Sequence, residues 1–207
     1  MRIDRAGVPF IACGLVPGVA LVALGHPLAA APFAAFAGLF ALFFRDPERR
    51  VPDVPGAVLA PADGRVLVAG PADPATAPPG AWQQISIFLS PADVHVNRIP
   101  VSGRLVRVEY RRGRFLPAYR PEAATRNERN ELWIERAGEM VVCRQVTGAL
   151  VRRVVCRVAA GTDVCAGDRF GIMKFGSRID LFLPARTGLN VRPGERVRAG
   201  ESVVARL

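Results

Sequence analysis

The chain has 207 residues, half of them hydrophobic, so it can bury one substantial core together with a short accessory segment. The formal net charge of +10 is carried almost entirely by arginine and fits a nucleic acid, an anionic membrane or a GC-rich genome, so charge alone identifies no partner. The four cysteines show no CxxC spacing and no signal-peptide cleavage site precedes them, which favours a reduced, cytoplasm-facing protein.

Two apolar stretches come first in the chain, over residues 7–25 and 27–44. Each is close to the ~20 residues that a helix needs to cross the hydrocarbon core of a membrane. The arginines of this region lie at the two outer ends of the pair: Arg2, Arg5, Arg45, Arg49 and Arg50. The positive-inside rule therefore predicts a membrane hairpin with both ends in the cytoplasm.

Proline residues in the same region support a second interpretation. Pro17, Pro27 and Pro32 can break helices, which favours a segment that lies in the membrane interface or re-enters without crossing. A spanning hairpin and a monotopic anchor both remain open. Either one predicts that residues 1–50 form a hydrophobic anchor at the cell membrane, and either argues against nucleic acid as a partner.

From Val51 onwards the chain changes to short β-type runs separated by glycine and proline. The runs cover residues 57–59, 65–69, 84–89, 103–110, 132–136, 140–146 and 151–158. A weak internal repeat aligns residues 158–168 with 191–201, and both copies predict a Gly-turn hairpin before a strand. We therefore expect residues 51–207 to form one mainly β domain, with hairpins that resemble those of lipoyl and biotinyl barrel-sandwich folds.

A Gly-Ser pair near the C-terminus, Gly176-Ser177, precedes the strand-like run 179–184. Gly176 can adopt backbone angles closed to other residues and leaves its carbonyl open to the neighbouring hydroxyl. Attack by Ser177 on that carbonyl would convert the amide into an ester, and elimination and hydrolysis would leave a pyruvoyl group at a new N-terminus. Gly-Ser alone is a weak signal, because the dipeptide is common in turns.

Four segments together resemble the short bacterial and archaeal phosphatidylserine decarboxylase proenzymes, in the same order along the chain. These segments are Phe44–Arg49, Ala60–Val66, Leu89–Arg98 and Phe175–Pro184. The resemblance implies a related barrel-sandwich or hybrid-motif β structure. It also implies self-cleavage between Gly176 and Ser177, into a large N-terminal and a small C-terminal chain that remain together as a heterodimer, since the small chain cannot hold a core alone.

Self-cleavage by a serine needs a base, because a hydroxyl is a poor nucleophile at neutral pH. The chain has two histidines, and His26 lies in the apolar anchor, so His95 is the candidate base of the β domain. On its own, Asp63-Gly64 predicts only a hairpin turn. The resemblance assigns Asp63, His95 and Ser177 to a self-processing triad in which Asp63 orients the histidine.

The sequence departs from the larger bacterial members of that family at two places. Arg98 stands where they usually have a second histidine, and Phe-Gly-Ser-Arg replaces Leu-Gly-Ser-Thr at the cleavage segment. It therefore stays open whether His95 serves cleavage, decarboxylation or both, and Asp93 is a possible second acid.

The cofactor implied by the resemblance is the pyruvoyl group formed from Ser177, without metal and without pyridoxal phosphate. Its ketone would form a Schiff base with an amine substrate and accept electrons as CO2 leaves. Lys174 is the alternative Schiff-base residue, but no phosphate-binding glycine loop accompanies it. The implied activity is a carboxy-lyase that converts phosphatidylserine, an anionic phospholipid of the membrane, to phosphatidylethanolamine and CO2.

Arginines mixed with aromatic residues at 110–120 suit a phosphate headgroup at the acyl boundary, and a solvated basic loop is the alternative. The candidate headgroup contacts are Arg111, Arg112, Arg114, Asn127 and Arg129. A different class of function also remains open. Residues 172–175, Ile-Met-Lys-Phe, resemble the Met-Lys turn of biotinyl domains, which would make the protein a membrane-anchored carrier or a lipid-binding module without catalysis.

Overall fold

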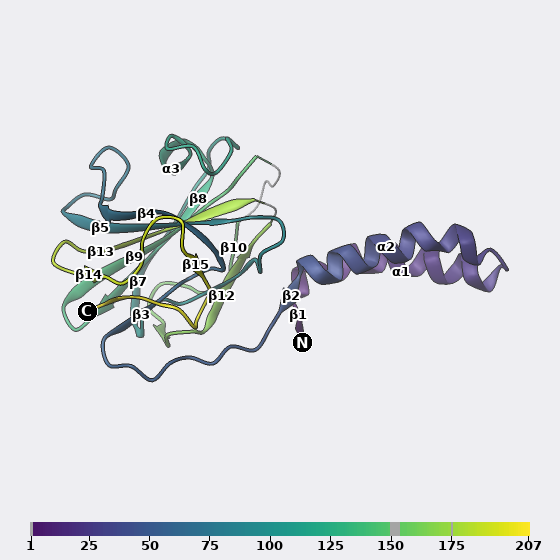
Figure 1. Cartoon of the computed structure of the whole chain (residues 1–207), viewed down its shortest axis with the longest axis horizontal. Coiled ribbons are helices and arrows are strands. Elements are labelled where there is room, and N and C mark those ends of the chain that lie inside the picture. Colours follow the sequence, from purple (N-terminus) through teal and green to yellow (C-terminus); the bar gives the residue numbers. More distant parts are fainter. Residues whose placement is uncertain (1, 150–153, 175) are drawn as a thin grey trace. The chain divides into compact units, whose positions relative to one another are not determined.

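The computed structural model describes residues 2–149, 154–174 and 176–207, which form two compact units, Met1–Glu48 and Arg49–Leu207. The first unit is helical and the second consists mainly of β-strands (Figure 1). The mainly β fold class with an N-terminal apolar helical segment is therefore confirmed.

A helical hairpin makes up the first unit. A short 3-10 turn, Arg5–Gly7, leads into helix α1, Val8–Ala23, and helix α2, Pro27–Phe43, runs beside it (Figure 1). Strand β1, Arg2–Ile3, pairs antiparallel with β2, Arg45–Asp46. The two ends of the hairpin are thereby fastened to each other.

The prolines of this unit do not interrupt its helices. Pro17 lies inside α1 and Pro32 inside α2, and Pro27 occupies the first turn of α2, where its missing N–H has no intrahelical partner to lose. Among the described residues, one helical stretch, Arg5–Ala23, is long and apolar enough by length and composition to cross a membrane, and α2 is shorter.

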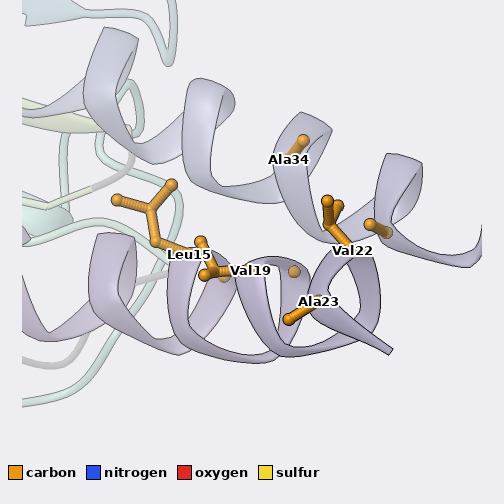
Figure 2. A pocket seen from close by; sticks show the side chains of 8 residues that line it. Leu15, Val19, Val22, Ala23 and Ala34 are labelled. Atoms are coloured by element: carbon orange, nitrogen blue, oxygen red, sulfur yellow. The ribbon is translucent and has the colours of Figure 1, made fainter. Parts of the chain in front are cut away.

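The hairpin leaves many large apolar side chains exposed, among them Val16, Val19, Leu24, Leu28 and Leu39. A cavity of about 360 Å³ lies between α1 and α2, lined by side chains such as Leu15, Val19 and Val22 of α1 and Ala34 of α2 (Figure 2). Its lining carries no charged or hydrogen-bonding side chain. An exposed apolar surface of this kind is typical of contact with lipid. The residues that line the cavity carry no acid, base or nucleophile.

Antiparallel strands curl into a half-barrel in the second unit. They are β3 (Ala57–Leu59), β4 (Gly64–Pro71), β5 (Trp82–Leu89), β6 (Val96–Arg98), β7 (Gly103–Arg111), β8 (Arg129–Arg136), β9 (Glu139–Val146), β10 (Val154–Cys156), β11 (Asp163–Val164), β12 (Arg169–Met173), β13 (Ser177–Pro184), β14 (Gly188–Leu189), β15 (Arg196–Val197) and β16 (Val203–Arg206). A short helix, α3, covers Ala123–Arg126. The predicted run 151–158 falls partly outside the described residues.

The described strands form one eight-stranded sheet, in the order β11-β7-β8-β9-β13-β5-β4-β15, and two three-stranded sheets, β10-β12-β6 and β14-β16-β3. Side chains alternate between the faces of the large sheet. In β13, for example, Ile179, Leu181 and Leu183 join the hydrophobic core, whereas Arg178 and Asp180 lie on the other face. The segment that begins at Ser177 is therefore in the middle of the sheet.

The internal repeat of the sequence corresponds to a structural repeat. Strand β11 belongs to the first copy and β15 to the second, and they occupy the two opposite edges of the eight-stranded sheet. The strand that follows each copy, β12 or β16, then pairs with β6 or β3 in one of the small sheets. Each copy thus contributes the same two pieces at opposite edges of the large sheet, and the curl of the sheet brings the copies close together, since a Cβ on Gly200 would lie 3.7 Å from the Cα of Gly167.

Candidate active site

Ser177 and the segments that carry His95 and Asp63 adjoin one end of three neighbouring strands of the large sheet. Ser177 begins β13 and pairs with Leu89, the last residue of β5. Phe88 of β5 in turn pairs with Arg65, near the start of β4. Because adjacent antiparallel strands lie about 4.8 Å apart, the start of β13, the end of β5 and the start of β4 lie side by side at the same end of the sheet. His95 lies six residues after the end of β5 and Asp63 directly precedes β4, so both lie on segments that adjoin this end of the sheet.

His95 is fully buried, and its ring orientation is defined by the turn that precedes it. The Nδ1 atom lies 2.8 Å from the backbone carbonyl oxygen of Asp93. A carbonyl only accepts, so Nδ1 carries the proton and the neutral ring has its basic lone pair on Nε2. The backbone carbonyl of His95 also accepts a hydrogen bond of 3.2 Å from the N–H of Met173. The histidine is thereby held against the strand that leads into the cleavage segment.

The carboxylate of Asp93 serves the same turn. It accepts hydrogen bonds from the backbone N–H of Ser90 at 2.8 Å and from the Ser90 hydroxyl at 2.6 Å, and Arg196 lies 3.5 Å from it. The structure therefore shows a turn-stabilising role for the Asp93 carboxylate, and its role as a second acid stays a prediction.

Asp63 is held by Arg49, which flanks the second apolar stretch and ends the segment Phe44–Arg49. The guanidinium of Arg49 lies 3.0 and 2.7 Å from the two carboxylate oxygens, and the N–H of Ala199 donates to one of them at 2.8 Å. Arg49 also contacts Glu201 at 3.3 Å, and its side chain is 7% exposed. The nearly buried negative charge of Asp63 is therefore compensated by a fixed cation.

The cleavage segment combines a left-handed glycine with a buried hydroxyl. Gly176 has a φ of +68°, which a residue with a side chain adopts only with strain. Its carbonyl oxygen lies so close to the Cα of Gly148 that a Cβ there would come within 1.6 Å of it. Ser177 is fully buried, and its Oγ has no hydrogen-bond partner among the described residues. A buried polar atom without a partner is unusual outside reactive sites, so the hydroxyl is poised for another interaction.

Comparison with known proteins gives matches that cover most or all of the chain. A sequence model of the family described as "Phosphatidylserine decarboxylase" matches residues 36–205. A phosphatidylserine decarboxylase proenzyme of Solibacter usitatus (strain Ellin6076) is 42% identical over 207 residues, which is 100% of this chain and 97% of the relative. Proenzymes of the same name from Nitrosomonas europaea and Nocardia farcinica are 41% and 42% identical, over 98% of this chain in both cases and 94% and 86% of the relatives. The chain belongs to the phosphatidylserine decarboxylase family.

Membership in the phosphatidylserine decarboxylase family confirms the resemblance drawn from the four segments and disfavours the carrier and lipid-binding alternatives. It also makes a lyase the appropriate enzyme class. Among the described residues, no group of three or more His, Cys, Asp or Glu gathers as metal ligands would. Burial raises the pKa of the Cys143 thiol well above its usual range, which leaves that thiol inert.

Asn127, a candidate headgroup contact, occupies a structural position in this decarboxylase family member. Its side-chain amide donates to the carbonyl oxygens of Leu116 at 2.7 Å and Thr147 at 2.8 Å, and its oxygen accepts from the N–H of Leu116 at 2.9 Å. Thr147 directly precedes Gly148. Asn127 therefore fixes the loop on which the carbonyl of Gly176 lies, a connection that no local sequence pattern predicts.

The candidate headgroup arginines fall into two groups. Arg112 and Arg114 are exposed beyond the end of β7. Arg111 and Arg129 pair across β7 and β8 and line a cavity on the outer face of the sheet. In the position where larger members of the phosphatidylserine decarboxylase family have a histidine, Arg98 is buried and donates to the carbonyl oxygen of Gly167 at 2.8 Å.

Proposed function

We propose that this protein is a self-processing phosphatidylserine decarboxylase, which cleaves itself between Gly176 and Ser177 and converts phosphatidylserine to phosphatidylethanolamine and CO2. The observation that carries the proposal is the buried Ser177 hydroxyl, which lacks a partner among the described residues and directly follows the left-handed Gly176. The pairing of β13 with β5 and of β5 with β4, from whose ends the segments of His95 and Asp63 extend, adds support.

The cleavage balances as follows. The Ser177 Oγ bonds to the carbonyl carbon of Gly176, and Nε2 of His95 takes the hydroxyl proton and returns it to the departing amide nitrogen. Loss of the Cα proton of residue 177 then expels the carboxylate of Gly176, and the dehydroalanine left behind takes up a proton at Cβ and releases one from nitrogen to become an imine. One water then hydrolyses the remaining imine to a ketone with loss of ammonia. The net change is one water consumed and one ammonia released.

The residues around Ser177 fit a pyruvoyl group, because this site already buries the oxygen-bearing carbon among backbone and core side chains. Such a group supplies an electron-withdrawing carbonyl to an amine substrate. His95 would hold a proton on Nε2 and deliver it to the substrate Cα after CO2 has left. Asp63, paired with Arg49 and with the N–H of Ala199, would hold the turn before β4 in place.

The small chain produced by cleavage would stay in place. Strand β13 pairs with β5 along its whole length and with β9 over Arg178–Phe182, so it lies in the interior of the sheet. Strands β15 and β16, also part of the small chain, pair with β4 and β3 of the large chain. These contacts support a mature enzyme in which the two chains form one heterodimer.

Residues 1–50 would attach this catalytic domain, residues 51–207, to the cell membrane, where its phospholipid substrate is found. The exposed apolar side chains of the hairpin and the length of Arg5–Ala23 support this part of the proposal. With arginines at both outer ends, the hairpin would leave the catalytic domain on the cytoplasmic side.

Mass spectrometry of Ser177→Ala tests the cleavage. The wild type should give a small fragment that begins with a pyruvoyl group at position 177 and one equivalent of ammonia, whereas Ser177→Ala should remain one chain without decarboxylase activity. Ser102→Ala is the matched control, because the Ser102 hydroxyl only accepts from the N–H of Ala166 and should leave cleavage unchanged. Active wild-type protein with an intact chain would refute the proposal.

The role of His95 is tested by comparing His95→Gln with His26→Gln, since these are the two histidines of the chain. We expect His95→Gln to remain uncleaved and His26→Gln to be processed at the wild-type rate. If His95→Gln is processed normally and loses only decarboxylation, the histidine acts in the second reaction alone.

A further inference from the structure

The face of the large sheet opposite the core carries rows of charged side chains. The register of β7, β8, β9 and β13 places Glu109, Glu131, Arg144 and Asp180 in one cross-strand row. Arg111 and Arg129 lie side by side in the next row, and Arg107 and Trp133 in the row on the other side. Charged and aromatic side chains are thus concentrated on this outer face of the sheet.

A cavity of about 540 Å³ opens on this outer face, beside the loop that contains residues 75–79. Its charged and aromatic lining consists of Arg107, Arg111, Arg129, Arg144, Glu109, Glu131 and Trp133. The two carboxylates are already engaged: Glu109 lies 2.6 Å from Arg111, and Glu131 lies 2.8 Å from Arg144. Four guanidinium groups therefore face two carboxylates, and the lining has an excess of two positive charges.

Two N–H donors in the cavity wall have no acceptor among the described residues: Nε of Arg129 and Nε1 of Trp133. Both atoms are buried. The nearest carboxylate oxygen to the Arg129 Nε, on Glu131, is 3.6 Å away, which is too far for a hydrogen bond. Neither group can accept a hydrogen bond, so only a ligand or solvent that supplies oxygen lone pairs can satisfy them.

The positive charges that surround the cavity also favour a bound anion. Burial, and next to it the positive charge of Arg144, lower the pKa of the Arg129 guanidinium. The guanidinium of Arg107 lies 3.8 Å from the ring centroid of Trp133, which holds this arginine over the indole. An anion bound among these groups would compensate the crowded positive charges.

We propose that this cavity is a phosphate-binding site, which takes a phosphate monoester or diester through Arg107, Arg129 and the indole N–H of Trp133. A tetrahedral phosphate offers several acceptor oxygens to converging donors, and the volume leaves room for the esterified group. The site is separate from the reaction centre, because side-chain alternation in β13 places Ser177 on the core side and Asp180 on the cavity side. The proposal does not depend on the reaction at Ser177.

Calorimetric titration of the full-length protein in a neutral detergent tests this site. Inorganic phosphate and monomeric dihexanoyl phosphatidylglycerol serve as probes for a free phosphate and for a lipid phosphodiester. We expect one binding event per protein. Tighter binding of inorganic phosphate identifies a soluble ligand, and tighter binding of the short-chain lipid identifies a membrane lipid. Absence of binding by both probes overturns the proposal.

Arg107 and Arg104 provide matched variants, because both are exposed on β7 and only Arg107 lines the cavity. Arg107→Gln should weaken binding of the preferred probe about tenfold or more, whereas Arg104→Gln should leave it unchanged. Trp133→Phe keeps an aromatic ring under Arg107 and removes the N–H donor, so it should also weaken binding severalfold. Equal affinities for Arg107→Gln and Arg104→Gln would show that the attraction is only the general charge of the protein.

Discussion

The carbonyl oxygen of Gly176 lies directly against the Cα of Gly148, at a distance that leaves no room for a side chain at position 148. Strand β9 ends two residues earlier, so the loop after β9 forms the surface on which the proposed scissile carbonyl lies. The geometry of the Gly176–Ser177 bond therefore depends on a glycine that is distant in sequence and carries no reactive group.

Gly148→Ala should block self-cleavage or slow it by about a hundredfold, because the scissile carbonyl has to move by more than 1 Å to make room for the new methyl group. The rate is measured as the disappearance of the uncut chain on a denaturing gel. Gly188→Ala is the control, since nothing lies within 4 Å of a Cβ at Gly188. Normal processing of Gly148→Ala would show that the carbonyl position is not critical.

Asn127→Ala should slow self-cleavage through the same loop. The substitution removes the amide that binds the carbonyl oxygens of Leu116 and Thr147, and we expect a loss of stability of about 2 kcal/mol together with slower processing. Processing is followed on gels and stability by thermal unfolding of the uncut chain. Asn190→Ala, at an exposed position, should change neither quantity. A variant that is destabilised but processed at the normal rate would separate the loop from the cleavage reaction.

Arg49→Gln should destabilise the β domain by about 3 kcal/mol, because it leaves the carboxylate of Asp63 nearly buried without its cation. The comparison is made by urea unfolding in the Ser177→Ala background, where the chain stays intact. Arg50→Gln is the matched control: only the backbone N–H of Arg50 contacts Glu201, and its side chain is exposed. Equal stabilities of the two variants would contradict the importance assigned to the Arg49–Asp63 pair.

Local sequence patterns predicted the parts of the structure that depend on short-range physics. The strand-like run 179–184 predicted a strand that the structure places in β13, and the repeat of 158–168 in 191–201 predicted equivalent pieces that the structure places at opposite sheet edges. Of the two interpretations left open for the apolar segment, the one in which proline breaks the helices does not hold at Pro17 and Pro32, because both helices continue through them.

The contacts that the sequence did not predict join segments distant in the chain. Arg49 was interpreted as a membrane-flanking charge, and its pairing with Asp63 depends on the fold alone. Gly148 gave no signal, because its contribution is the absence of a side chain at one point in space. The outer-face cavity combines residues of three strands, and their register is not written in any local pattern.

The acid stability of the β domain should depend on Glu201. Burial raises the pKa of this carboxyl, but hydrogen bonds from the Arg50 backbone and the Arg49 guanidinium outweigh that effect, so the pKa lies below its ordinary value. The stabilisation is therefore complete above the unfolded-state pKa of about 4.3 and disappears as the pH falls through the lower folded-state pKa. Between about pH 6 and about pH 3, the melting temperature of Glu201→Gln should therefore fall less than that of the parent, with both measured in the uncut Ser177→Ala chain. The control Glu195→Gln, at an exposed position, should show the same pH profile as the parent. If Glu201→Gln also shows the parent's pH profile, the acid sensitivity belongs to other carboxylates.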